Sequence, residues 1–456
     1  MTISKETAHL EHSSVKMTVT IGKEDVRSEY DVVLSEYGKT VQIPGFRKGK
    51  VPRDVLIRKF GDAFNQETLG RILEKAAEEI FADEAFPAED RPLPYSRPRI
   101  EDEPETLNID EDLVFSMTYD VLPRVTVGKH KDLEVEVPDA ELTDEDISRE
   151  LEAIRERNAI ILDRDEEAPA VLNDVVTVNY TELSDSGEPV AGSERQDFVF
   201  TLGSFHNSYK FDDEITGMKK GETRDIEKTY PADFDDADLA GKTKKIRVTL
   251  SALKEKKLPD LDDDLAQDVD EKYKTLEDLK ASVRDRLVKN LDRQIREISI
   301  SRLLEKILET TPVDVPESMI RIELNGRWRN LARQFGVDAE ELAGRMEASG
   351  NGPEPILEEW RPHAIKALQS RLIVETLIRD LAIAASEEET ERELETIAQE
   401  TGTPPEEVKK YYEPENTREL LTENIKERKL FDLLLSENTI KKGKMEKYLD
   451  LVQNNG

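Results

Sequence analysis

Cysteine is absent from the 456-residue sequence, which excludes disulfides, thiolate zinc sites and cysteine nucleophiles. Histidine is scarce as well, with five residues in the whole chain. His9 and His12 have a spacing that would let them share a metal, but both lie in a short polar segment and are more simply read as solvated. We therefore predict no metal site. A reducing compartment is the natural setting for a chain without cysteine.

Long apolar runs are also absent, since no stretch has the length and apolarity of a bilayer span. The segment Met1–Leu10 lacks the basic patch, apolar run and cleavage site of a secretory signal. We therefore expect a cytoplasmic protein without a membrane partner. Glycines that cradle phosphate are missing too, because Gly203, Gly217 and Gly221 do not precede a Lys-Ser or Lys-Thr at the required spacing. We expect no cofactor and no use of ATP.

Basic residues are in the minority, with 66 Lys and Arg against 101 Asp and Glu, which gives a formal charge of −35. Such a surface repels phosphate, so any contact with nucleic acid must be local. Aromatic residues make up 6% of the chain and charged residues 37%. This balance suits extended helices with solvated faces better than one large globule, and the length predicts two to four domains.

The first segment has the pattern of a compact α+β domain, which we assign to residues 1–124. Apolar residues alternate over 15–21 and 113–121, as they do in half-buried strands, and a helix is predicted over 24–37. Residues 39–53 contain two glycines and two prolines and therefore read as a loop. The pattern then predicts a helix that opens at Pro52 and ends at Gly61, followed by a longer helix over 64–84.

Two segments of different character follow. Residues 125–164 read as a linker strand and a charged helix that opens at Thr143 with a capping-box pattern. Residues 165–255 alternate in several short stretches separated by glycine-containing turns, which predicts a β-rich domain.

Residues 256–456 are predicted to be entirely helical. Apolar residues recur at helical spacing after Thr275 and again after Pro316, with breaks at Pro312 and around Ser349–Pro353. Further helices are predicted over 356–384, 387–400, 405–412 and 417–435. Helix pairs with short turns form a bundle or projecting hairpins. Acidic runs such as 262–264 and 387–389 are typical of solvated helix faces.

The sharpest local feature is a basic loop. Residues 41–60 contain six bases and one acid, a local charge of +5 in a strongly acidic chain. Arginine and lysine on a protruding loop pair with phosphates or carboxylates, and the two glycines would allow the backbone to approach a surface closely. An exposed Phe46 would enter an apolar groove on a partner. The alternative is a solvated loop with Phe46 folded back into its own domain, and composition does not decide between them.

Residues 45–52 match the Gly-Phe-Arg-x-Gly-Lys-x-Pro signature of the trigger factor family at every specified position, and the chain resembles that family over nearly its whole length. The resemblance implies an ATP-independent chaperone that binds nascent and unfolded polypeptides, with roles in protein folding, cell division and the cell cycle. It also leaves open a homodimer away from the ribosome. The residues that it implies in contact with the large ribosomal subunit near the exit tunnel are Gly45, Phe46, Arg47, Lys48, Gly49 and Lys50.

The β-rich segment is similar to FKBP-type peptidyl-prolyl isomerases, on the evidence of residues 176–180, 198–203, 217–222 and 230–234. This fold uses no nucleophile: an aromatic-lined pocket favours the twisted prolyl amide and so lowers a rotation barrier of roughly 18–20 kcal/mol. The pocket residues that the resemblance implies are Tyr180, Phe198, Phe211 and Phe234. The alternative for such aromatics is ordinary packing of the small barrel.

Several positions depart from the isomerase pattern. Val190 replaces an aromatic residue, Asn207 and Ser208 replace a Val-Ile pair, Lys210 replaces a glycine and Phe234 replaces a tyrosine. Each lost aliphatic side chain would cost roughly 1–3 kcal/mol of proline binding. We therefore predict weak isomerase activity.

The predicted fold class is a multidomain α+β protein: an α+β ribosome-binding domain, an FKBP-like β-rich domain with a short helix, and an all-α chaperone domain with helical arms. A second hypothesis is a free-standing cytosolic isomerase whose helices serve oligomerisation, and a third is an export-pathway chaperone. The basic loop favours the ribosome-associated chaperone over the free-standing isomerase. The lack of a signal segment counts against the export-pathway chaperone.

Overall fold

The computed structural model describes residues 1–102, 104, 106–184, 186–236, 238–348 and 350–453. The chain divides into two compact units, Met1–Val137 with Glu297–Gly443, and Pro138–Arg296 with the residues from Lys444 onward. Each unit is described by itself. Among the described residues, none of the helices combines the length and apolarity that crossing a bilayer requires.

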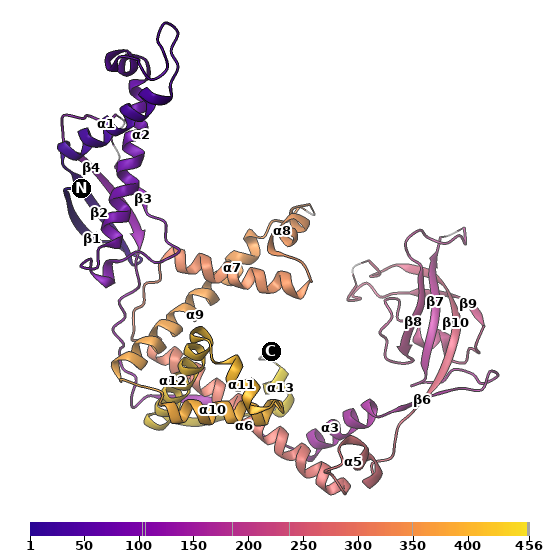
Figure 1. The fold of residues 1–456 in the computed structure, drawn as a ribbon. Helices are drawn as coiled ribbons and strands as arrows, with labels where there is room; N and C mark the ends of the chain where they lie inside the picture. Colours follow the sequence, from indigo (N-terminus) through magenta and orange to yellow (C-terminus); the bar gives the residue numbers. More distant parts are fainter. Residues whose placement is uncertain (103, 105, 185, 237, 349, 454–456) are drawn as a thin grey trace. The chain divides into compact units, whose positions relative to one another are not determined.

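The N-terminal part of the first unit is a four-stranded antiparallel sheet in the order β1-β2-β4-β3, covered by two helices (Figure 1). Residues of β2 alternate between buried and half-buried, so Val15, Met17, Val19 and Ile21 enter the core. The elements of this part are β1 (Ile3–His9), β2 (Ser14–Ile21), α1 (Lys23–Thr40), α2 (Arg53–Ala82), the 3-10 turn η1 (Ala88–Asp90), β3 (Arg99–Ile100) and β4 (Leu113–Asp120).

The N-terminal segment differs from its prediction as a short polar stretch. It forms β1, which pairs with β2 over its full length and leaves its polar side chains exposed at the sheet edge. His9 and His12 do not face a common point: the His9 ring lies 3.4 Å from Asp90, and the His12 ring lies 2.8 Å from Asp314. Within the described residues there is no group of three or more His, Cys, Asp and Glu side chains that could hold a metal.

The predicted helix end at Gly61 appears as a kink instead. α2 continues from Arg53 to Ala82, but Phe60 has non-helical backbone angles (φ −133°, ψ 15°). Two helical segments therefore join at the residue before the glycine, and the second packs Phe64 and Ile72 into the core.

The C-terminal part of the first unit is helical, with a core shared by α6, α7, α9 and α12. Leu93 and Leu133 also pack into this core. The sequence pattern missed α8 and a strand, β11, whose Thr439 N–H donates to the Leu133 carbonyl at 2.9 Å beside β5. The elements are α7 (Glu317–Gln334), α8 (Ala339–Ala348), α9 (Glu354–Asp380), α10 (Glu387–Thr401), α11 (Pro405–Tyr411) and α12 (Glu415–Glu437). The division between the units also runs through β5 (Glu134–Glu141), α6 (Leu276–Leu308) and β11 (Thr439–Lys447), of which residues 134–137, 297–308 and 439–443 belong to the first unit.

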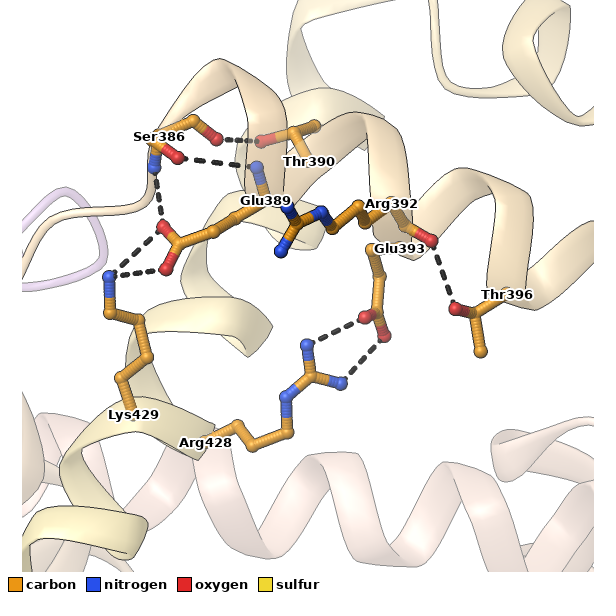
Figure 2. A network of polar contacts seen from close by, with 8 residues as sticks. All are labelled: Ser386, Glu389, Thr390, Arg392, Glu393, Thr396, Arg428 and Lys429. Atoms are coloured by element: carbon orange, nitrogen blue, oxygen red, sulfur yellow. Dashed lines mark hydrogen bonds and ion pairs between the residues drawn. The ribbon is translucent and has the colours of Figure 1, made fainter.

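Polar contacts fix α10 against α12 (Figure 2). Ser386 and Glu389 form a capping box at the start of α10, and the Lys429 ammonium donates to both Glu389 carboxylate oxygens at 2.7 and 3.0 Å. The Arg428 guanidinium donates to both Glu393 oxygens at 2.9 and 2.6 Å. The Lys429 ammonium and the Ser386 N–H lower the pKa of Glu389 to about 2, so this carboxylate stays charged at neutral pH.

The second unit contains a five-stranded antiparallel sheet, in which β6-β10-β7-β8 are neighbours in that order and β9 also pairs with β10. Its core is formed by alternate residues of β7 and β10 together with α4. The Thr143 capping box predicted from the sequence is present at the start of α3. The elements are α3 (Asp144–Arg157), β6 (Ile160–Asp163), β7 (Val175–Leu183), β8 (Arg195–Thr201), α4 (Asp212–Ile215), β9 (Thr223–Thr229), β10 (Thr243–Lys257), α5 (Asp263–Val269), the first half of α6 and α13 (Tyr448–Gln453).

Candidate docking loop and isomerase site

The loop between α1 and α2 consists of two consecutive turns. The Phe46 N–H donates to the Ile43 carbonyl at 3.1 Å, and the Lys50 N–H donates to the Arg47 carbonyl at 2.9 Å. The third position of each turn is a glycine with positive φ, 92° at Gly45 and 78° at Gly49, as type II turns require. A Cβ at either glycine would meet nothing within 4 Å in this chain, so backbone conformation is what demands glycine here.

The bases of the loop are largely unpaired. Arg53 pairs with Asp31, and the Lys59 ammonium lies 5.7 Å from the centre of the Phe60 ring. Arg47, Lys48 and Lys50 are exposed and make no ion pair with any residue that the structure describes. The loop therefore presents uncompensated positive charge at the end of the α1–α2 hairpin that is remote from the sheet (Figure 1).

Phe46 lies at the tip of the first turn. Its side chain is 38% exposed, and it is not part of the apolar core of this domain, whereas Ile43 and Val41 at the base of the loop pack against that core. An aromatic ring that remains partly exposed next to two unpaired cations, here Arg47 and Lys48, is a typical anchor for a partner surface.

Three of the four predicted pocket residues lie together in the β-rich domain. The Tyr180 ring centre lies 5.8 Å from that of Phe198 and 5.3 Å from that of Phe211, in edge-to-face arrangements. Phe200 extends the cluster, 5.6 Å from Phe198 and 6.2 Å from Phe211. Tyr180 and Phe211 are buried and Phe198 is half-buried, so Phe198 stands at the open side of the cluster.

Phe234 joins this cluster indirectly. Its ring lies 5.0 Å from Tyr230, and the Tyr230 hydroxyl donates to the Tyr209 carbonyl at 2.6 Å. Tyr209, which the sequence reasoning missed, lies 5.8 Å from Tyr180. The only sequence signal for Tyr209 is its place two residues before Phe211, in a segment that departs from the isomerase pattern.

Burial raises the pKa values of Tyr180 and Tyr230, and it is also the largest cause of the rise in the Tyr209 pKa to about 12. The Tyr209 hydroxyl donates to Glu182 at 3.1 Å, which adds to that rise. All three phenols are therefore protonated at neutral pH. The arrangement offers an apolar aromatic wall with neutral hydroxyl groups, which can hold a proline ring and stabilise a twisted amide without covalent chemistry.

Asn207, interpreted from the sequence as a lost apolar pocket residue, points into the loop before α4 and is fully buried. Its side-chain amide donates to Asp212 at 2.5 Å, and its side-chain oxygen accepts from the Phe211 N–H at 3.0 Å. Asp212 also accepts from the N–H groups of Gly203 and Phe205, at 2.8 and 3.0 Å. Asn207 therefore braces the loop that positions Phe211. Ser208, in contrast, is exposed and hydrogen-bonds with Tyr180.

Three family models match successive parts of the chain. The model for the bacterial trigger factor protein matches residues 1–154, that for FKBP-type peptidyl-prolyl cis-trans isomerase matches residues 166–251, and that for the trigger factor C-terminus matches residues 275–436.

Curated relatives match over almost the full length. The trigger factor of Treponema denticola is 42% identical over 456 residues, covering 99% of this chain and 100% of the relative. That of Treponema pallidum is 37% identical over 453 residues, covering 99% of each. A solved structure of the trigger factor chaperone is 24% identical, with a TM-score of 0.48 and coverage of 95% of this chain and 99% of that one. The chain belongs to the trigger factor family of chaperones and carries an FKBP-type peptidyl-prolyl isomerase domain.

Proposed function

We propose that this chaperone docks on the large ribosomal subunit near the exit tunnel through Gly45, Phe46, Arg47, Lys48, Gly49 and Lys50, and receives nascent polypeptides there without ATP. The observation that carries the proposal is the exposed pair of glycine turns, which presents an aromatic ring among unpaired bases in a chain of charge −35. Ribosomal RNA supplies phosphates for the bases, and ribosomal protein supplies an apolar groove for the ring. This function places the protein in the cytoplasm.

Each segment then has its own role. Residues 1–124 dock, 125–164 link, 165–255 isomerise prolyl bonds, and 256–456 hold clients on helices whose apolar stripes are not all buried. Exposed Ile322 on α7, Phe335 at the C-cap of α7 and Leu420 on α12 support such a surface. Weak contacts at many sites let a nascent chain bind and leave without a powered step. Away from the ribosome, the same surfaces would support a homodimer, and a role in cell division would follow from the clients served.

The isomerase site is proposed to use Tyr180, Phe198, Phe211 and Phe234, with Tyr209 completing the wall. The ring distances support a proline pocket that opens at Phe198. Activity is expected to be weak because Val190 and Ser208 are exposed where the isomerase pattern has apolar pocket residues.

Ribosome co-sedimentation tests the docking proposal. Replacing Phe46, Arg47 and Lys48 together by alanine should abolish sedimentation with ribosomes and leave the circular dichroism spectrum unchanged, because these side chains pack into no core. A matched control removes two exposed bases and one exposed aromatic residue elsewhere, as Lys409→Ala, Lys410→Ala and Tyr411→Ala. Undiminished sedimentation of the loop variant, or an equal loss in the control, would contradict the proposal.

Aggregation suppression tests the client-holding proposal. A chain lacking residues 165–255 should still prevent light scattering by a protein diluted from denaturant, whereas a chain lacking residues 260–456 should not. The first domain has its own apolar core over residues 15–121, so the second truncation leaves it folded. Equal protection by the chain without its helices would place the holding surface elsewhere.

A further inference from the structure

The strand β6 lies at an open edge of the β-rich domain. It pairs antiparallel with the end of β10, with Ile160 opposite Lys257 and Asp163 opposite Lys254. In the same register, the Arg164 N–H donates to the Leu253 carbonyl at 3.2 Å. Hydrogen-bonded pairs alternate along an antiparallel ladder, so Leu162 and Ile160 direct their N–H and C=O groups toward β10. Ile161 and Asp163 direct their N–H and C=O groups away from β10, and no described strand pairs with β6 on that side.

The same strand exposes three consecutive aliphatic side chains. Ile160, Ile161 and Leu162 are 57%, 45% and 46% exposed. Because successive strand residues point to opposite faces, the apolar surface covers both faces of the β6–β10 ribbon. β6 therefore combines open main-chain groups with side chains that an extended apolar segment would bury.

The other edge strands of this domain are protected. On β8 the register shifts opposite Val178–Tyr180, and Asp197 has a positive φ of 51°, which interrupts the edge. β9 carries four charged residues, Arg224, Asp225, Glu227 and Lys228. Charges and bulges of this kind prevent edge-to-edge pairing in natural sheets. Residues 160–162 of β6 include neither a charge nor a bulge, so its open edge is free to pair with another strand.

We infer that β6 binds an extended, aliphatic-rich segment of an unfolded client, which adds as a further strand at the edge formed by Ile161 and Asp163. Main-chain hydrogen bonds give the affinity, and Ile160, Ile161 and Leu162 select apolar side chains. This inference rests on the proposed client-binding function and adds a site outside the proline pocket. Main-chain hydrogen bonds and aliphatic contacts involve no net charge, so binding at the ribbon should depend little on salt.

Peptide binding to the full chain, followed by fluorescence anisotropy, tests the inference. The probe is a labelled, unstructured peptide with Val, Ile and Thr in alternation. Its matched form has N-methyl groups on alternate amides, which remove donors and block strand pairing while keeping the side chains. N-methylation should weaken binding about tenfold, the equivalent of two main-chain hydrogen bonds.

The Ile161→Pro variant gives the matching change in the protein. Proline is tolerated at an edge position whose N–H faces solvent, so the sheet should remain folded while the open donor is lost. The variant should bind the unmodified peptide about tenfold more weakly, and N-methylation should then have little further effect, as expected when both changes remove the same pairing. Ile161→Val, which keeps the N–H, should bind normally. Val171→Ser with Leu172→Ser is the control for loss of exposed aliphatic surface elsewhere in the domain.

Equal binding of both peptides by the unaltered protein would overturn the inference, and this measurement decides the matter even if Ile161→Pro unfolds the domain. Unchanged peptide affinity in a folded Ile161→Pro variant would also overturn it. If that variant instead converts a dimer to a monomer, the edge pairs with a second copy of the chain and the inference is overturned. Ribosome co-sedimentation and aggregation suppression are measured separately, so the proposed function can stand when this site fails.

Discussion

Asn207→Val is the substitution that separates two interpretations of the isomerase pocket. If Asn207 merely replaced an aliphatic wall residue, valine would restore apolar surface and raise activity. The structure instead predicts loss of stability, because Asn207 donates to Asp212 and accepts from the Phe211 N–H, and all three residues are buried.

The size of the loss follows from these contacts. A hydrogen bond to a charged group contributes about 1.5–3 kcal/mol, and a buried N–H left without a partner costs about 1–3 kcal/mol. Burying the valine methyl groups returns about 1 kcal/mol. The free energy of unfolding of the β-rich domain should therefore fall by about 3 kcal/mol, which is roughly a hundredfold change in the unfolding equilibrium.

Hydrogen exchange of the full chain, followed by mass spectrometry, measures this change locally. Amides of β7 and β10, which open only with the whole domain, should lose about a hundredfold of their protection, and those of β2 and β4 should not change. Prolyl isomerisation should fall as well. Unchanged protection together with faster isomerisation would refute the bracing role and restore the interpretation of Asn207 as a missing pocket wall.

Four further outcomes are expected. Ser208→Ile should raise isomerase turnover about fivefold, equivalent to ~1 kcal/mol of added apolar contact at an exposed position beside Tyr180, as a peptide assay would show. Gly45→Ala should cost about 1 kcal/mol in loop strain because its φ is 92°, and ribosome affinity should fall about fivefold in co-sedimentation. The pKa of Glu389 is lowered to about 2, so its carboxylate stabilises α10 fully above pH 4.5 and loses this effect as the pH falls toward 2. Hydrogen-exchange protection of α10 should therefore fall between pH 4.5 and 2, and the Glu389→Gln variant should not show this fall. Ribosome affinity should pass through a maximum as salt increases, in sedimentation from about 0.01 to 1 M.

Strong periodicity made most of the fold predictable. The alternating residues of β2, β4 and β7 and the cap of α3 follow from local sequence because each signal lies within a few residues. β1 and β11 were missed because their side chains are mostly polar and exposed, and their pairing comes from distant partners that local pattern cannot show. Tertiary pairing, rather than composition, makes these segments strands.

The candidate sites were predictable to a different degree. The glycine and proline spacing of the candidate docking loop indicated turns, and the structure supplies what the spacing could not: which bases remain unpaired. Arg53 is engaged by Asp31, whereas Arg47 makes no such pair within the described residues. Asn207 was misread because one sequence position shows its polarity but not whether the side chain faces the pocket or the loop interior.

A basic loop on an acidic protein can bind ribosomal RNA well only when salt screens the repulsion between the rest of the chain and the RNA but leaves the short-range attraction of the loop. At about 0.01 M salt the screening length is roughly 30 Å, so carboxylates throughout the acidic chain repel ribosomal phosphate together with the loop that attracts it. Near 0.15 M the length falls to about 8 Å, and only charges beside the contact, which are those of Arg47, Lys48 and Lys50, still act on the RNA. At about 1 M these are screened as well. The affinity therefore peaks at intermediate salt if the loop is the contact, whereas docking through the acidic remainder of the chain would strengthen steadily as salt rises.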